Sequence, residues 1–270
     1  SAEFKTEHYE MVLKAGDMER SLEDLVFHLE EPRVGQSYPN YYSAKLASKF
    51  VKVILSGSGG DELFGGYPWR YPRPQSDNDL ESYVNNYYNY WQRLIPNEYM
   101  AKIFSPIWKE VKDVDTKSYF INILVNKNRN QINVKEELID QSLYFEAKTF
   151  LHGLLLVEDK LSMAHSLETR VPFLDNDLVD FALKCPVKFK INTLQKNKYL
   201  DENTSGKKEK TYFEETGDGK LILRKMMKKY LPKDVVERKK QGFSSPDASW
   251  FRGDSIDFVK RRLQNKNAKI

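Results

Sequence analysis

Apolar and polar residues follow two different periods along this chain, and the order of these periods predicts its first elements. Residues 4–13 alternate imperfectly and predict a strand. Residues 21–29 and 41–50 repeat apolar positions at helical spacing, with Ser21 as the expected N-cap of the first helix. The β-branched run 51–55 predicts a buried strand of a parallel sheet. The opening of the chain therefore predicts a strand, helix, helix, strand crossover.

After a Pro-rich linker near residue 74, the chain shows helical spacing to about residue 157 and almost no strand signal. One apolar stripe runs through Tyr83, Tyr87, Tyr90, Trp91 and Leu94. A second runs through Leu138, Ile139, Leu143, Ala147, Phe150, Leu151 and Leu154. Aromatic stripes can stack nucleic-acid bases, but the aromatic stripe here contains only one basic residue, Arg93, so we interpret both stripes as helix packing.

Residues 158–175 place many polar groups between apolar ones. The pattern predicts a helix start, a buried polar network and an extended exit before Pro172. Buried charges are costly unless they are paired, so we expect mutual salt bridges or ligand contacts for Asp159, Lys160, Glu168 and Arg170.

The rest of the chain predicts short helices separated by polar segments. A helix is expected at 178–182, a loop at 191–219, a helix at 221–230 and a basic amphipathic helix towards the end of the chain.

Composition narrows the function classes. Lys and Arg outnumber Asp and Glu by 43 to 39 without a concentrated basic patch, which argues against nucleic-acid binding. No apolar run approaches the ~18 residues of a membrane span, so we expect a soluble chain. The single cysteine, Cys185, excludes an internal disulfide and favours a reducing, cytoplasmic setting. Because the chain begins at Ser1 without a signal peptide, we expect a piece of a longer protein.

The densest chemical signal is the loop that follows residues 51–55. It reads Ser-Gly-Ser-Gly-Gly-Asp-Glu over residues 56–62. Glycines at the carboxyl end of a parallel strand let the backbone approach a ligand, and successive N–H groups there can cradle an anion. Asp61 and Glu62 would lie at the mouth of this cradle, where a carboxylate beside phosphates commonly holds Mg²⁺.

Three strings resemble the synthetase domain of glutamine-dependent asparagine synthetases. Ser-Gly-Ser-Gly-Gly-Asp-Glu-Leu-Phe-Gly-Gly-Tyr, from residue 56 to 67, is similar to the second signature loop of that family. Residues 158–175 are similar to its Asp-Arg-x-Ser-Met-Ala-x-x-x-Glu-x-Arg-x-Pro-Phe-Leu-Asp signature, with Lys160 in the place of Arg. Glu237 to Phe243 is similar to a segment whose lysine contacts pyrophosphate, and Lys240 holds that place. The resemblance covers roughly residues 4–260.

The resemblance implies a helix-rich α/β fold. Residues 1–74 would form a partial nucleotide-binding region, the remnant of an adenine nucleotide alpha hydrolase-like (ATP-pyrophosphatase) parallel sheet. Residues 75–270 would form a mainly helical region. It also implies a ligase that uses ATP and Mg²⁺ to adenylate aspartate, which ammonia from a glutaminase domain then converts to asparagine. A homodimer is possible in such a family.

The resemblance also implies roles for particular residues. ATP would contact Ser56, Gly57, Gly59, Gly60, Asp61 and Lys240, with Asp61 also holding the metal. Ser58, Glu62 and Lys240 would be catalytic. The family usually carries an acid where this chain has Ser58. Either Glu62 takes over, or the acceptor differs, or the activity is weakened.

Two family features are absent from these residues, the Ser-Gly-Gly-x-Asp-Ser phosphate loop and the glutaminase. We therefore expect the chain alone to be inactive as a ligase. Two alternatives stay open. One is a related amide-forming ligase, such as a β-lactam synthetase-like enzyme, and the other is a non-catalytic interaction module on the same scaffold.

Overall fold

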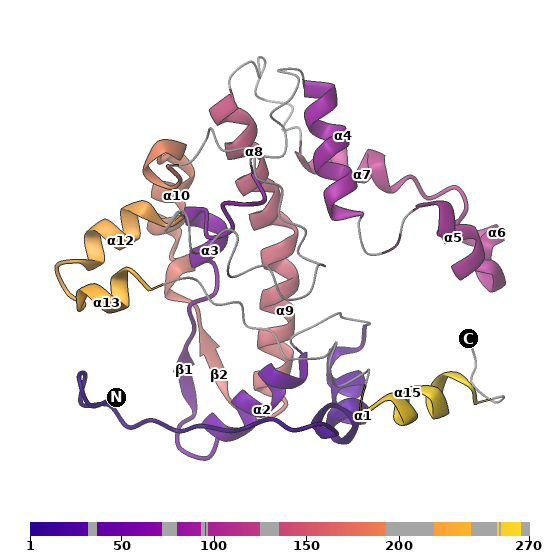
Figure 1. Cartoon of the computed structure of the whole chain (residues 1–270), viewed down its shortest axis with the longest axis horizontal. Coiled ribbons are helices and arrows are strands. Elements are labelled where there is room, and N and C mark those ends of the chain that lie inside the picture. The colour runs from indigo at the N-terminus through magenta and orange to yellow at the C-terminus, as the bar shows by residue number, and fades with distance from the viewer. Residues whose placement is uncertain are drawn as a thin grey trace. The chain divides into compact units, whose positions relative to one another are not determined.

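The computed structural model describes residues 1–31, 37–71, 80–92, 95, 97–124, 135–192, 219–238, 253 and 255–265. Helices dominate the described residues, and two short parallel strands form a sheet, which confirms a helix-rich α/β class (Figure 1). The chain divides into two compact units. Unit 1 comprises Ser1–Ser56, Gly153–Pro172 and Gly242–Ile270, and unit 2 comprises Gly57–His152 and Phe173–Gln241.

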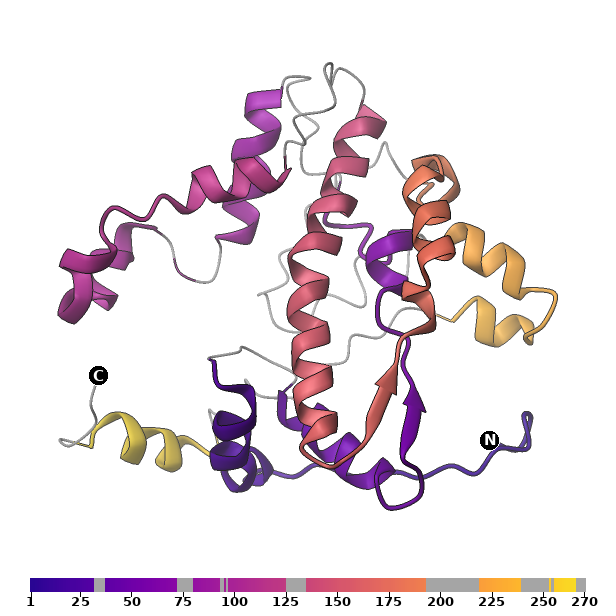
Figure 2. The ribbon, with the colours of Figure 1, turned by 180° about the vertical axis from the view of Figure 1, so that it is seen from behind.

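The sheet of unit 1 pairs β1 (Val53–Leu55) in parallel with β2 (Glu168–Arg170) (Figure 2). Val53 lies opposite Glu168 and Leu55 opposite Arg170. The strand and its parallel pairing were correctly predicted, but its burial was not, because Val53 is 50% and Leu55 75% exposed. Successive side chains point to opposite faces, and only the face of Ile54 is half-buried in β1.

Three helices supply the core of unit 1. They are α1 (Asp17–Leu29), α2 (Ser37–Ala47) and the part of α9 (Phe150–Met163) that belongs to this unit. Their buried side chains are Leu25, Leu29, Tyr38, Tyr41, Val157 and Leu161. This unit also contains α15 (Ile256–Leu263), in agreement with the helix expected near the end of the chain.

Two details of the first 30 residues differ from expectation. Residues 4–13 are almost entirely exposed and form no strand. Alternation alone cannot create a strand without a partner for its backbone groups, and the described residues offer none there. The first helix begins at Asp17 after Gly16, so Ser21 is not its N-cap. Ser21 is buried inside the helix, where its hydroxyl donates to the Asp17 carbonyl at 3.0 Å.

Unit 2 is built from helices. Their bounds are α3 (Gly60–Phe64), α4 (Leu80–Trp91), α5 (Asn97–Ile103), α6 (Trp108–Val111), α7 (Thr116–Leu124), α8 (Lys135–Lys148), α10 (Asn176–Lys184), α12 (Leu221–Met227) and α13 (Lys233–Val236). Short 3-10 turns occupy Ser105–Ile107, Pro172–Leu174 and Val187–Phe189. Helices were therefore correctly predicted over most of this part of the chain.

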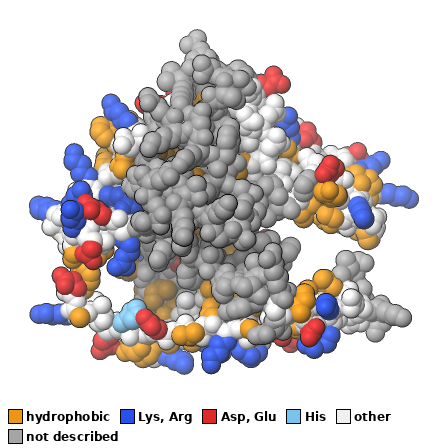
Figure 3. Space-filling model, viewed as in Figure 1, with side chains coloured by type: hydrophobic (Ala, Val, Ile, Leu, Met, Phe, Trp, Pro, Cys, Tyr) orange, Lys and Arg blue, Asp and Glu red, His pale blue; other side chains and the backbone are white. Residues whose placement is uncertain are grey.

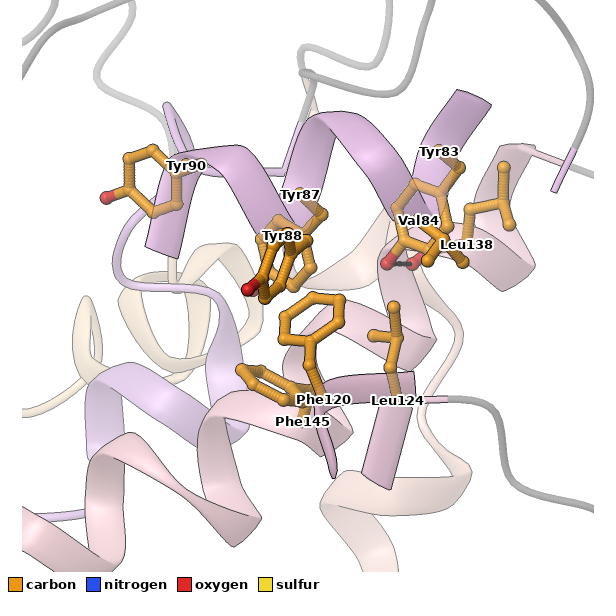
Figure 4. Packing of buried hydrophobic residues seen from close by; sticks show 9 residues of the cluster. All are labelled: Tyr83, Val84, Tyr87, Tyr88, Tyr90, Phe120, Leu124, Leu138 and Phe145. Atoms are coloured by element: carbon orange, nitrogen blue, oxygen red, sulfur yellow. Dashed lines mark hydrogen bonds between the residues drawn. The ribbon is translucent and has the colours of Figure 1, made fainter. Parts of the chain in front are cut away.

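The aromatic stripe is core, as its spacing predicted. It packs α4 against α7 and α8, and the cluster is Tyr83, Val84, Tyr87, Tyr88, Tyr90, Phe120, Leu124, Leu138 and Phe145 (Figure 4). Trp91 packs against the edge of this cluster. Leu94, the last residue of the expected stripe, lies outside the described residues.

The polar stretch that begins at residue 158 differs from expectation in two ways. It contains the end of α9 rather than a helix start, and β2 follows. One expected mutual salt bridge exists, between Arg170 and Glu168 at 2.8 Å, whereas Lys160 pairs at 2.7 Å with Glu30, which directly follows α1. Glu168, Arg170 and Glu30 are exposed, so these two pairs are not the buried network that was expected.

The later helices agree with the sequence pattern. The expected helix at 178–182 is the inner part of α10, and α12 falls inside the expected 221–230. Most of the expected loop, residues 193–218, lies outside the described residues. Among the residues that the structure describes, no helix combines the length and apolar character needed to cross a bilayer.

Candidate functional site

The acidic pair lies on α3, a five-residue helix with a left-handed glycine at each end. Gly59 precedes it with φ +92°, and Gly65 follows it with φ +71°. A Cβ on Gly59 would lie 2.5 Å from Cδ2 of Leu174, so both the backbone angle and the space require glycine there. The glycines of the loop therefore shape the short helix that presents Asp61 and Glu62.

The loop before α3 is open. Gly57 is exposed, and a Cβ added to it would meet nothing within 4 Å. Ser58 is half-buried, and Gly60 is buried against the ring of Phe173. Ser56 is the last residue of the first segment of unit 1, and its backbone N–H donates to the Arg170 carbonyl at 2.8 Å. The exposed backbone at Gly57 leaves room for a ligand to approach closely.

Asp61 forms an ion pair with Lys220, whose Nζ lies 2.7 Å from Oδ1. Both side chains are partly exposed. The segment at Lys220 is held against α3, because the backbone N–H of Lys220 donates to the Phe64 carbonyl at 3.1 Å. Lys220 is the left-handed residue directly before α12. Lys and Arg side chains gather on the side of the molecule where α12 and α13 lie (Figure 3). Lys220 was not predicted from the sequence, where its one signal is a lysine at the start of an amphipathic helix.

Gly66 lets the Asp61 carboxylate fold back over the turn. A Cβ on Gly66 would lie 1.7 Å from Oδ1 of Asp61, which is not physically possible. The Gly66 N–H also donates to the Asp61 carbonyl at 2.7 Å. The Gly-Gly pair that ends the motif thus makes room for the carboxylate, in addition to closing the helix.

Glu62 points into the protein. It is 2% exposed, and its Oε1 accepts a hydrogen bond from the hydroxyl of Tyr67 at 3.0 Å. Burial and the negative charges of Glu62 and Asp61 raise the pKa of Tyr67, so its hydroxyl stays a neutral donor. The two acids of the motif therefore differ in environment, with Asp61 partly open and Glu62 enclosed.

A buried arginine lies behind this turn. Arg70 is 5% exposed, and its guanidinium carbon lies 3.8 Å from the ring centroid of Tyr67 and 4.6 Å from that of Phe150. Its Nη1 lies 3.2 Å from Oε2 of Glu146, which has no exposed surface. Neither Arg70 nor Glu146 was predicted from the sequence, because 76 positions separate the two residues and no local pattern links them.

Glu146 is held from a second side by Tyr87, whose hydroxyl donates to Oε1 at 2.8 Å. Burial raises the pKa of Glu146 to about 7, although Arg70 and the Tyr87 hydroxyl act in the opposite direction. The nearby charge of Glu62 raises it further. One buried cation thus lies near two buried carboxylates.

The residues suit Mg²⁺ only in part. Among the described residues, no group of three or more His, Cys, Asp or Glu could hold a metal ion by itself. Mg²⁺ commonly takes one or two protein carboxylates and completes its shell with phosphate oxygens and water. The partly open carboxylate of Asp61 suits such a minimal site.

The structure brings together some of the predicted site residues. Gly59, Gly60, Asp61 and Glu62 form one short turn, with Lys220 added to it. Lys240, which was expected to contact pyrophosphate and to be catalytic, lies outside the described residues.

The chain matches one family of known proteins. A family model described as "Asparagine synthase" matches residues 1–270. The chain is 29% identical to asparagine synthetase [glutamine-hydrolyzing] 1 of Bacillus subtilis over 285 residues, which cover 96% of this chain and 41% of the relative. It is also 29% identical to asparagine synthetase [glutamine-hydrolyzing] 3 of the same organism, over 89% of this chain and 34% of that protein.

A shorter match with higher identity is to putative asparagine synthetase [glutamine-hydrolyzing] 2 of Methanocaldococcus jannaschii. It is 43% identical over 65 residues, which cover 24% of this chain and 13% of that protein. The chain spans about two-fifths of the length of the Bacillus subtilis relative with the longest match. Because the family model covers every residue, the chain belongs to the asparagine synthase family.

Proposed function

We propose that the chain is the synthetase part of a glutamine-dependent asparagine synthetase. The reaction is ATP-dependent adenylation of aspartate, followed by amidation with ammonia to give asparagine, AMP and pyrophosphate. The observation that carries the proposal is the Asp61–Lys220 ion pair directly after an open glycine loop. Family membership and the names of the relatives support the same reaction.

The chemistry divides into two transfers. In the first, an oxygen of the aspartate β-carboxylate bonds to the α-phosphorus of ATP and pyrophosphate leaves. In the second, ammonia bonds to the acyl carbon, AMP leaves with the electron pair of the broken bond, and a proton leaves the nitrogen. Fixed positive charge is needed where negative charge gathers on the leaving phosphates.

Particular residues would meet these needs. Asp61 would hold Mg²⁺, which when bound offsets the charge of the phosphates. Lys220 would then exchange its carboxylate partner for a phosphate oxygen, and Lys240 would add a second cation. The backbone N–H groups of the loop that begins with Ser56 and Gly57 would face the nucleotide.

Ser58 and Glu62 would have different tasks. Ser58 would offer a hydroxyl to the substrate rather than a base. Glu62 is buried and accepts a hydrogen bond from Tyr67, so it is better suited to supporting the turn than to contacting the substrate. The finer fold expectation, an ATP-pyrophosphatase-type parallel sheet, is supported by the parallel pairing of β1 and β2. The division at residue 74, a homodimer and a cytoplasmic location stay predictions.

The test uses the full-length natural protein with ATP, Mg²⁺, aspartate and ammonium. Pyrophosphate release should depend on aspartate, and asparagine should accumulate. Asp61→Asn should lower the rate by about 100-fold or more, the scale expected when one charge-stabilising group is lost. Asp175→Asn is the matched control, because Asn is an equally good N-cap for α10 and the rate should stay unchanged. A full-length protein that binds ATP and Mg²⁺ but makes no asparagine would refute the proposal.

A related amide-forming ligase is the second candidate, and Ser58 favours it, because the family usually carries an acid at that place. A substrate screen by pyrophosphate release separates the two, since release with another acceptor and not with aspartate would support the relative. A non-catalytic module would bind no ATP in calorimetry, even in the presence of Mg²⁺.

A further inference from the structure

We propose that Arg70 and Glu146 are positioning residues for the acidic turn. They act through Tyr67, whose ring lies against Arg70 and whose hydroxyl holds Glu62. The inference rests on the proposed function only in assigning a catalytic task to the turn. The path, which is the chain of contacts from Glu146 on α8 through Arg70 and Tyr67 to Glu62 on α3, lies within unit 2 alone.

The first link is the ion pair between Arg70 and Glu146. Both side chains are almost fully buried, so neither charge can be solvated by water if its partner leaves. Removing one member of such a pair is far more costly than removing an exposed one. The second hydrogen bond to Glu146, from Tyr87, fixes the carboxylate on the core side. Arg70 therefore has a strongly preferred position.

The second link is the contact between Arg70 and Tyr67. The guanidinium carbon lies 3.8 Å from the ring centroid, which is the geometry of a cation–π contact. The backbone N–H of Arg70 also donates to the backbone carbonyl of Tyr67 at 2.9 Å. Side chain and backbone together restrict how the ring of Tyr67 can turn, and they leave its hydroxyl directed at Glu62.

The third link is α3 itself. Glu62 follows Asp61 directly on a helix of only five residues. A rotation of the backbone at one of these residues therefore also moves the other. A helix this short has little stability of its own and takes its orientation from packing. It packs against α8, the helix that carries Glu146. The hydrogen bond from Tyr67 to Glu62 thus fixes the direction in which Asp61 points.

Charge makes this path sensitive to pH. The groups that face Glu146 are the guanidinium of Arg70, the carboxylate of Glu62 and the phenols of Tyr71, Tyr83 and Tyr87. Burial raises the pKa of Glu146 to about 7. When Glu146 is protonated, Arg70 loses its full counter-charge and its hold on Tyr67 is weaker. The position of the turn should therefore change with the ionisation of Glu146 near neutral pH.

The test compares two tyrosine variants in the full-length protein. Tyr67→Phe removes the hydroxyl that reaches Glu62. Tyr83→Phe is the control, since it removes a buried tyrosine hydroxyl that bonds to the Leu138 carbonyl of α8 (Figure 4) and to Ser142, but not to the turn. Tyr67→Phe should lower kcat for pyrophosphate release by about 10-fold with KM for ATP unchanged, a pattern typical of lost transition-state contacts. Tyr83→Phe should stay within 2-fold of the unsubstituted protein.

Glu146→Gln tests the rest of the path. It should remove the inflection near pH 7 from the pH profile of kcat. The double variant Tyr67→Phe/Glu146→Gln should be no slower than the slower single variant, because both changes break one path. Additive losses, or a pH profile that Glu146→Gln leaves unchanged, would overturn the inference.

A readout that needs no activity keeps this test separate from the proposed function. Hydrogen exchange of the amides of residues 60–66 should become faster in Tyr67→Phe and in Glu146→Gln, but not in Tyr83→Phe. Faster exchange in a protein that makes no asparagine would support the path and refute the function. An active protein in which Tyr67→Phe behaves like Tyr83→Phe in both assays would refute the path alone.

Discussion

Gly59→Ala should destabilise unit 2 far more than Gly57→Ala, although the two positions are two residues apart in one loop. Gly59 has φ +92°, which costs an alanine about 1–2 kcal/mol. The new methyl group would also lie 2.5 Å from Cδ2 and 3.0 Å from Cγ of Leu174. Overpacking of this kind costs about 1–3 kcal/mol. The expected loss in the free energy of unfolding is therefore about 2–5 kcal/mol.

Gly57→Ala is the control, because a Cβ there meets nothing within 4 Å. Its effect should stay within about 0.5 kcal/mol of zero, apart from a small gain through the unfolded chain. Urea denaturation followed by tryptophan fluorescence measures both variants, since Trp69 and Trp91 lie in the same unit. Equal losses for the two variants, or a loss under 0.5 kcal/mol for Gly59→Ala, would refute the assignment of a strained, crowded glycine.

A double-mutant cycle separates the two causes. If the methyl group collides with Leu174, then Gly59→Ala should cost less in a Leu174→Ala background, by about the 1–3 kcal/mol of overpacking. If only the backbone angle matters, the two substitutions should be additive. An additive cycle would show that the space around Gly59 is larger than the structure indicates.

Three further predictions concern stability. The pKa of Glu146 in the folded protein, about 7, is above its usual value of 4.5, so the folded state binds more protons between these values and stability should fall by about 3 kcal/mol as pH rises from 4.5 to 7. Glu146→Gln should remove that slope in urea titrations at several pH values, and an unchanged slope would contradict the assignment. Asp175→Ala should cost about 0.5–2 kcal/mol, because the carboxylate accepts the N–H groups of Asp177 and Leu178 at the start of α10; circular dichroism at graded urea concentrations would show no loss if the cap is unimportant. Leu161→Ala should cost about 2–5 kcal/mol in thermal or urea unfolding, since this fully buried side chain belongs to the core of unit 1, and a loss under 1 kcal/mol would contradict that core.

The parts of the fold that follow from local pattern were predictable from the sequence. Tyr83, Tyr87 and Tyr90 repeat at helical intervals, and this spacing alone placed them on the buried face of α4. The strand within 51–55 and the glycine-rich loop after it were also predictable, because a strand propensity and a glycine turn both depend on neighbouring residues. The same method failed at residues 4–13, where an alternating pattern has no partner strand among the described residues.

The sequence by itself determined most of the helices and their apolar faces, and where glycines and acids meet in one turn. Only the tertiary structure decided that Lys220 neutralises Asp61, and that Arg70 and Glu146 are enclosed together behind Tyr67. The physical reason is range. Helix propensity and periodicity act over a few residues, whereas a charge pair depends on which distant segments the core brings within a few ångströms of each other.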